Sequence, residues 1–180
     1  MFRIMIVDDE VNIIKSLTRA LAGEYEIESF ESPSAALARA NGKEFDLVMS
    51  DYRMPEMNGV DFLAAVKERQ PHAARLILSG YTDRDELIGA INKAEIYRFL
   101  SKPWDEYELK VTIAQAIAHS KLLAENQRLA DTVRQRERKV SELNDIMTFQ
   151  KRELERLEKL HPGITKLTMD DEGNYISSIS

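Results

Sequence analysis

Hydrophobic and polar positions along the first 120 residues alternate between two patterns. Short apolar runs read as strands at residues 3–7, 25–30, 46–50, 75–79 and 96–100. Several runs are apolar at nearly every position, which is typical of strands buried on both faces of a parallel sheet. Segments of helical period lie between them, at residues 11–22, 33–40, 60–69 and 85–94. The alternation predicts a doubly wound α/β domain over residues 1–120, with a five-stranded parallel sheet and helices on both faces.

The last helix of this domain is predicted to continue well beyond the sheet. No Gly or Pro interrupts the sequence from Trp104 to Leu160. Seam residues recur there at spacings of four and three, as in the heptads of a coiled coil. At 1.5 Å per residue such a helix would be about 85 Å long. It is expected to end where Pro162 and Gly163 interrupt it. We predict a coiled-coil helix over residues 121–160, continuous with the last domain helix, and a tail or linker over residues 161–180. The seam consists of Leu122, Asn126, Leu129, Val133, Arg136, Val140, Leu143, Met147, Gln150, Leu154 and Leu157.

The apolar seam predicts a homodimer, because an unpaired helix would leave a continuous leucine stripe in water. Asn126 is suited to fixing the register of two strands, whereas Arg136 and Gln150 weaken their layers. The flanking charges do not settle the direction of the helices. In a parallel pair, for example, Glu153 would face Glu158, which is unfavourable.

Composition and charge narrow the function. The net charge of −6 gives no electrostatic case for nucleic acid or an anionic membrane as the main partner. The absence of cysteine excludes disulfides and thiolate metal sites. The N-terminal apolar run is too short, and too soon acidic, for a signal peptide or a membrane span. These features predict a cytoplasmic protein.

Polar side chains stand where the apolar strands end. The first strand runs into Asp8 and Asp9, the third into Asp51, the fourth into Ser79 and the fifth into Lys102. Each residue alone could be a helix cap or a turn former. In a flavodoxin-like strand order of 2-1-3-4-5, however, ligands bind at the carboxyl ends of the strands, beside strands one and three. We therefore expect these side chains to converge on one site.

Carboxylates gathered in one site repel each other unless a cation joins them. Hard oxygen ligands suit Mg²⁺, which also bridges to phosphate. Lys102 would supply a charge for phosphoryl oxygens, and Ser79 a hydrogen-bond donor. Asp51 is central in the sheet, so it is the expected nucleophile, forming an acyl phosphate.

Four motifs then identify a family. The segments IVDDE, VMSDYRMPEMNG, LILSGY and YRFLSKPW resemble the receiver domain of two-component response regulators over residues 1–120. The resemblance implies that Asp51 receives a phosphoryl group from a phosphohistidine on a sensor histidine kinase. It also implies that Asp9 binds Mg²⁺ directly, that Asp8 binds it through water, and that the backbone carbonyl of Arg53 is a further ligand.

The resemblance assigns further roles near the acceptor. Ser79 matches the switch hydroxyl, and Lys102 the phosphate-binding residue, with a cis bond to Pro103. Phe99 matches the aromatic that swings inward on activation. Tyr97 is the other aromatic of that strand, and alternation places it on the same face as Phe99.

Two large residues flank the expected phosphoryl site. Arg53 lies two residues after the acceptor, and Tyr81 two after Ser79. Both are expected to restrict the attacking water and to prolong the phosphorylated state. If both point outward instead, neither affects the site.

The sequence gives less information on the downstream output of the receiver. The chain is similar to receivers linked to output enzymes, such as cyclic-dinucleotide phosphodiesterases of the HD-GYP type. The sequence carries no second active site, so we expect no enzyme activity beyond phosphorylation and dephosphorylation of the receiver itself. Either an output enzyme or domain is missing from this chain, or the coil is the output. Two alternative functions for the chain are a flavodoxin-like metal-dependent phosphatase and a coiled-coil adaptor with a non-signalling receiver.

Overall fold

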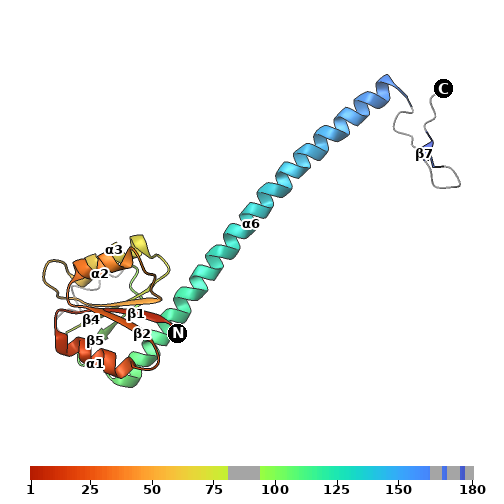
Figure 1. Cartoon of the computed structure of the whole chain (residues 1–180). Helices are drawn as coiled ribbons and strands as arrows, with labels where there is room; N and C mark the ends of the chain where they lie inside the picture. The colour runs from red at the N-terminus through yellow and green to blue at the C-terminus, as the bar shows by residue number, and fades with distance from the viewer. Residues whose placement is uncertain (81–93, 163–167, 170–174, 177–180) are drawn as a thin grey trace. The chain divides into compact units, whose positions relative to one another are not determined.

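The computed structural model describes residues 1–80, 94–162, 168–169 and 175–176 (Figure 1). The chain divides into two compact units, Met1–Asn126 and Gln127–Ser180. The first holds a single sheet whose strands are β1 (Arg3–Val7), β2 (Glu26–Phe30), β3 (Leu47–Asp51), β4 (Ala74–Ser79) and β5 (Arg98–Ser101). The helices within the described residues are α1 (Val11–Leu21), α2 (Pro33–Ala40), α3 (Gly59–Arg69) and α6 (Glu106–Leu160). The second unit also contains a two-stranded antiparallel pair, β6 (Thr168–Met169) and β7 (Tyr175–Ile176).

The five strands of the first unit are parallel and follow the order β2-β1-β3-β4-β5. This confirms the predicted flavodoxin-like α/β fold. Strands β3 and β4 are buried at every position, as their unbroken apolar runs indicated. The helix expected at residues 85–94 lies almost wholly outside the described residues.

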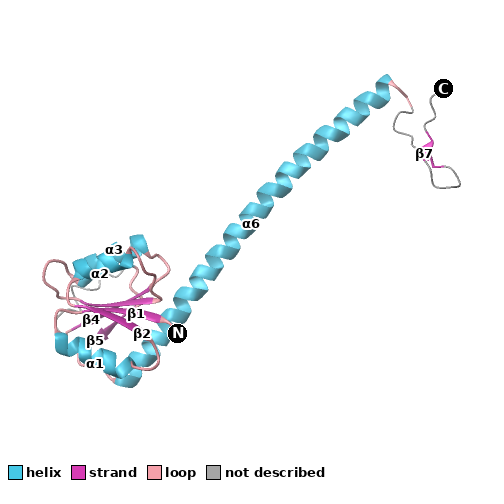
Figure 2. Cartoon of the chain, viewed as in Figure 1, coloured by secondary structure: helices cyan, strands magenta, loops and turns pink. Residues whose placement is uncertain are grey.

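Helices cover both faces of this sheet (Figure 2). One core cluster joins the sheet to α2 and α3, with Met5, Val48 and Phe62 among its fully buried members. The other joins it to α1 and the first turns of α6, with Ile6 and Leu109 buried there. Successive residues of a strand point to opposite faces, so one short run of apolar residues supplies both clusters.

The helix α6 begins at Glu106, two residues later than the sequence suggested. Asp105 accounts for the difference, because its carboxylate accepts a hydrogen bond from the backbone N–H of Glu108 at 2.9 Å and so caps the first turn. The acidic residues Glu106 and Glu108 in that turn complement the helix dipole. At the other end, the helix stops at Leu160, just before Pro162.

The predicted pairing of Tyr97 and Phe99 on one face is wrong. Phe99 packs against the cluster that contains α2 and α3, whereas Tyr97 packs against the cluster that contains α1 and α6. Strand β5 begins only at Arg98, because the chain turns at Glu95, where φ is +47°. Tyr97 therefore precedes the strand, and strand alternation does not apply to it.

One outer edge of the sheet is formed by β2, which carries a cluster of ion pairs. Glu28 lies 2.6 Å from Arg39 and 2.5 Å from Lys43, measured between charged atoms. Glu26 pairs with Lys43 at 2.7 Å and with Arg3 at 3.1 Å. Hydrogen bonds from Arg39 and then from Lys43 lower the pKa of Glu28 to about 2.

Candidate functional site

Three predicted site residues meet at the carboxyl edge of the sheet. The ammonium of Lys102, just after β5, lies 2.8 Å from Asp8 Oδ2 and 2.5 Å from Asp51 Oδ1. Asp8 follows β1 and is fully buried, and Asp51 is the last residue of β3 and is also buried. Parallel strands β1 and β3 are neighbours, so their ends bring the two carboxylates together. The structure thus shows the predicted convergence for these side chains.

The backbone holds both carboxylates in place. The N–H of Arg53 donates to Asp51 Oδ2 at 2.8 Å, and the N–H of Glu10 donates to Asp8 Oδ1 at 2.8 Å. Both bonds span two residues and close a tight turn directly after a strand. Each carboxylate therefore keeps one oxygen on the backbone and presents the other to Lys102.

Burial and charge act in opposite directions on this cluster. Burial raises the pKa of Asp8, although the hydrogen bonds from Lys102 and from the Glu10 backbone lower it in part. For Lys102, burial alone would lower the pKa, but the hydrogen bonds and charges of Asp51 and Asp8 raise it above its ordinary value. The lysine therefore stays charged, and it offsets the repulsion between the two carboxylates.

The other predicted site residues have definite positions as well. Asp9 directly follows Asp8 and is exposed. Ser79 ends β4 and is buried, and its carbonyl accepts a hydrogen bond from the N–H of Lys102 at 2.8 Å. Phe99 is half-buried within β5, and the Lys102–Pro103 peptide bond is cis as expected. Tyr81 lies outside the described residues.

Glycine at position 59 is a requirement that the sequence did not reveal in full. Gly59 begins α3, and a Cβ atom added there would lie 2.1 Å from the backbone oxygen of Asp51. The N–H of Gly59 also donates to the carbonyl of Tyr52 at 2.8 Å. The loop after the acceptor therefore returns to touch the acceptor's own backbone, which only a residue without a side chain permits.

Glu10 continues the acidic run at the end of the first strand and also lies beside this site. Its carboxylate lies 3.9 Å from the ammonium of Lys102, and its side chain is 66% exposed. It stands next to the acid pair at the start of α1, so its charge adds to the negative potential of the edge. The sequence IVDDE contained this signal, because the acidic run continues beyond the pair.

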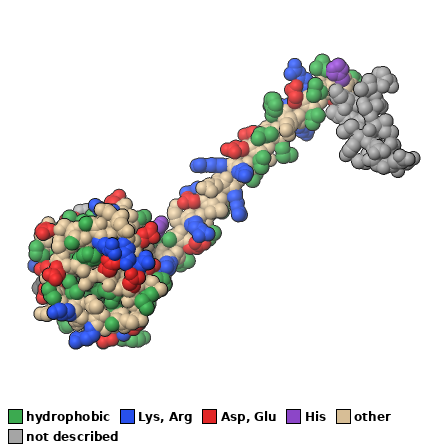
Figure 3. All heavy atoms as spheres, viewed as in Figure 1, with side chains coloured by type: hydrophobic (Ala, Val, Ile, Leu, Met, Phe, Trp, Pro, Cys, Tyr) green, Lys and Arg blue, Asp and Glu red, His purple; other side chains and the backbone are tan. Residues whose placement is uncertain are grey.

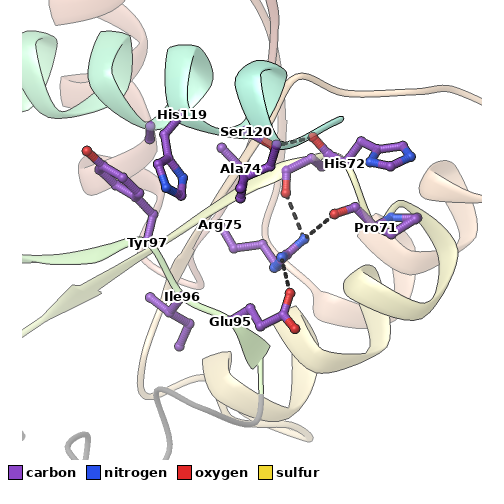
Figure 4. Close-up of a pocket in the computed structure, with 12 residues that line it drawn as sticks. Pro71, His72, Ala74, Arg75, Glu95, Ile96, Tyr97, His119 and Ser120 are labelled. Carbon is purple, nitrogen blue, oxygen red and sulfur yellow. Dashed lines mark hydrogen bonds and ion pairs between the residues drawn. The ribbon is translucent and has the colours of Figure 1, made fainter. Parts of the chain in front are cut away.

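A separate cavity of about 540 Å³ lies at the opposite edge, where β4 begins (Figure 4). Its most buried polar group is Arg75, which donates to the carbonyls of Ala94 and Ala73 at 2.7 Å each. Arg75 also donates to the carbonyl of Pro71 at 3.2 Å. Its guanidinium thus ties the turn before β4 to the turn before β5. This residue has a structural role at the base of the sheet, away from the carboxylates.

The donor set of the carboxylate edge fits magnesium. Asp8, Asp9 and Asp51 supply hard carboxylate oxygens, which Mg²⁺ prefers. The positively charged ammonium of Lys102 already contacts two of these carboxylates, those of Asp8 and Asp51. Within the described part of the chain, no group of three or more acidic or histidine side chains forms a ready metal cage. A metal ion at this edge would share the carboxylates with Lys102.

The chain is similar to known proteins over most of its first unit. The family described as the response regulator receiver domain matches residues 4–114. The hydrogenase transcriptional regulatory protein HoxA of Cupriavidus necator is 35% identical over 126 residues, which are 70% of this chain and 26% of that protein. The DNA-binding transcriptional regulator NtrC of Salmonella typhimurium is 33% identical over 117 residues, or 64% of this chain and 25% of its own length. The chain thus spans about a quarter of the length of these curated relatives.

Solved structures give the same result for the first unit. The signal receiver domain of an HD domain-containing protein from Pseudomonas fluorescens is 35% identical, with a TM-score of 0.63, and the match covers 66% of this chain and 96% of that one. A structure described as adenylate cyclase from Rhodopirellula baltica is 30% identical, with a TM-score of 0.68, over 72% of this chain and 96% of that one.

Proposed function

The chain belongs to the response regulator receiver domain family, and from this premise we propose that Asp51 is its phosphoryl acceptor. The observation that carries the proposal is the position of the Asp51 carboxylate, 2.5 Å from the ammonium of Lys102 and 2.8 Å from the N–H of Arg53. The donor is a phosphohistidine of a sensor histidine kinase. A carboxylate oxygen of Asp51 forms a bond to phosphorus, the P–N bond to the donor imidazole breaks, and its electron pair stays on the imidazole nitrogen.

Lys102 and the backbone stabilise the transferred group. In the transition state, negative charge spreads over the phosphoryl oxygens. A nearby cation stabilises this charge and so lowers the energy of the transition state. Asp8, Asp9, Asp51 and the carbonyl of Arg53 would hold Mg²⁺. When bound, the metal supplies further positive charge to these oxygens. Asp8 also contacts the ammonium of Lys102 at 2.8 Å, which helps to keep this ammonium beside the acceptor.

Phosphorylation is proposed to act on Ser79 and Phe99. Ser79 lies at the end of β4, one residue beyond Leu78, which is the strand partner of Asp51. A phosphoryl group within reach of its hydroxyl would favour one of two conformations. Phe99 is half-buried, so its side chain is proposed to turn either inward to the core or outward to solvent. The switch would then pass along β5 toward α6.

Treatment of the full chain with acetyl phosphate and Mg²⁺ is expected to add one phosphoryl group. Intact-mass spectrometry measures the gain of about 80 Da, the mass of one PO₃H group. The variant Asp51→Asn keeps the size of the side chain but removes the nucleophilic oxygen, so it should gain nothing. Asp61 is also acidic, but it lies in the first turn of α3, where its carboxylate accepts a hydrogen bond from the side chain of Asn58 at 2.8 Å. Asp61→Asn is therefore the matched control and should be phosphorylated like the parent. Equal labelling of Asp51→Asn and the parent would contradict the assignment.

The same assay addresses the proposed role of Arg53. Its backbone lies beside the acceptor carboxylate, so its side chain is placed to restrict the approach of water. We propose that it prolongs the phosphorylated state beyond seconds. Loss of the added mass after removal of acetyl phosphate gives the lifetime, and decay within seconds would contradict this role. We propose the same role for Tyr81, which lies outside the described residues.

The receiver is a signalling module, and its intact acidic residues, hydroxyl and lysine favour that role over a phosphatase or a non-signalling adaptor. The similar receiver from Pseudomonas fluorescens belongs to an HD domain-containing protein, which suggests an HD domain as the output of this receiver as well. We propose that the coil transmits the state of the receiver to such an output. A cysteine-free chain is consistent with a reducing cytoplasm. None of the helices in the described ranges combines the length and apolar character needed to cross a bilayer.

We also propose that α6 pairs with a second copy of the chain as a parallel coiled coil. The apolar seam residues are exposed along the helix, from Leu122 at 61% to Leu154 at 53% (Figure 3). Such a stripe is stable in water only when another surface covers it. Val133 and Val140 lie at a positions, and Leu129 and Leu143 at d positions, which favours a coil of two helices.

Sedimentation equilibrium of the parent at micromolar concentration is expected to show a dimer. Leu143→Asp places two carboxylates in one core layer and should convert the parent to a monomer. The matched control Ser141→Asp adds the same charge two positions away, on the outer face of the helix, and should remain dimeric. A monomeric parent would contradict the coil proposal.

A further inference from the structure

Arg136 is a seam residue with no acidic residue within reach on its own helix. On a helix only residues three or four positions apart lie side by side. At these spacings from Arg136 the sequence has Thr132, Val133, Lys139 and Val140. Arg136 is exposed, and an isolated cation in a core layer is costly unless a charge compensates it.

The next residue, Glu137, has the opposite charge and a similar lack of partners. The only basic residue three or four positions from it is Arg134. The guanidinium of Arg134 lies 3.2 Å from Asp131 and is engaged on that side. Arg136 and Glu137 are therefore adjacent, exposed and oppositely charged, yet neighbours in sequence do not face each other on a helix.

A parallel second copy would bring these two charges together. In a parallel, in-register coil each d side chain enters a hole made by four residues of the facing helix. Around Arg136 these residues would be Val133, Arg136, Glu137 and Val140 of the second copy. Without a nearby carboxylate, the two arginines of this layer would only repel each other.

We propose that Arg136 of each helix forms an ion pair with Glu137 of the second copy, and that these two ion pairs set the register of the coil. The inference rests on the proposed parallel dimer. The long stem of arginine covers the apolar layer while its planar guanidinium reaches the flanking carboxylate, which it can bind through two N–H groups. A shift by one heptad would place Arg136 opposite Leu129 or Leu143 and leave both charges without their partner. The pair thus selects one register among several that would bury the leucines.

Charge reversal on the full chain tests the pair. Arg136→Glu places two acidic residues together in each half of the layer, and Glu137→Arg places two basic residues together. Each single variant is expected to weaken the dimer by at least about tenfold in sedimentation equilibrium, because like charges at close range disfavour association. The double variant Arg136→Glu/Glu137→Arg restores opposite charges and should return to within about threefold of the parent. As a control, Arg138→Glu reverses an exposed charge outside the hole and should leave the dimer unchanged.

The outcomes separate this inference from the dimer itself. A dimeric parent with restored affinity in the double variant supports the ion pairs. A dimeric parent whose double variant stays as weak as the single variants overturns the ion pairs and leaves the dimer standing. A monomeric parent overturns both. Circular dichroism at helical wavelengths shows whether each variant remains helical, so that a loss of helix is not mistaken for a loss of pairing.

Discussion

Gly59→Ala is expected to lower the free energy of unfolding by about 3 kcal/mol or more, the upper range for overpacking a tight site. The new Cβ would lie 2.1 Å from the backbone oxygen of Asp51 and 3.1 Å from the hydroxyl of Ser50. The first contact is far too short and involves backbone, so the strand end or the start of α3 must move, whereas the second is tight and requires only a small shift of the Ser50 side chain. Because the displaced residue is the acceptor itself, phosphorylation should also slow at temperatures at which the variant is still folded.

Gly42→Ala is the matched control for this effect. A Cβ at position 42 would meet nothing within 4 Å. Its substitution should change the free energy of unfolding by no more than about 0.5 kcal/mol, as for most surface sites. Urea unfolding followed by circular dichroism measures both variants, and acetyl phosphate labelling measures the acceptor. A Gly59→Ala variant as stable and as reactive as the parent would show that the loop does not hold the acceptor by this contact.

Lys102→Met is expected to slow phosphorylation of Asp51 by about 100-fold or more, the usual effect of removing one preorganised charge from a transition state. Methionine keeps an unbranched chain of similar length but lacks the ammonium that lies against both carboxylates. Fully buried Asp8 then loses its counter-charge, and the free energy of unfolding at neutral pH should fall by about 3 kcal/mol. Acetyl phosphate labelling over time and urea unfolding measure the two effects.

The pH dependence of Lys102→Met follows from the pKa of Asp8. Burial already raises that pKa in the parent, and loss of Lys102 removes an influence that lowers it. A carboxyl whose pKa is higher in the folded state binds its proton more tightly there, so protonation favours folding. The stability deficit of Lys102→Met should therefore be largest at neutral pH and should shrink as the pH falls toward about 4. A deficit that is constant across this range would mean that Asp8 does not carry it.

Lys43→Met tests whether any paired lysine gives the same result. Lys43 also contacts two carboxylates, at 2.7 Å and 2.5 Å, but these belong to the exposed edge of β2. Its removal should cost no more than about 1 kcal/mol, as for surface ion pairs, and should leave phosphorylation unchanged.

The sequence predicted most of the fold because apolar runs and helical period are local signals. The same signals predict Asp51 and Lys102 at the ends of strands. In a parallel sheet these ends lie at one edge, so the two side chains come together. Contacts between distant residues were harder to foresee. The approach of Gly59 to the Asp51 carbonyl depends on how the loop returns to the strand, which no periodicity encodes. The buried role of Arg75 also depends on two turns that are adjacent only in the folded sheet.

Errors arose where a local pattern was extended past its element. Alternation was applied to Tyr97, but the turn at Glu95 delays β5, and Tyr97 lies on the other side of the sheet. The absence of Gly and Pro predicts a helix from Trp104, whereas the cap at Asp105 starts α6 at Glu106. In both cases a single residue with a specific backbone role decided the boundary.

The charged pairs on β2 have a consequence for solubility. An outer strand of a sheet carries unpaired backbone groups that can recruit a strand from another molecule, and charged side chains on that strand oppose such association. Glu26 and Glu28 provide these charges, and Arg3, Arg39 and Lys43 hold them in place. Because the pKa of Glu28 is about 2, its charge persists in acid that neutralises ordinary carboxylates. The edge is therefore protected against strand-by-strand aggregation even when the rest of the surface has lost much of its negative charge.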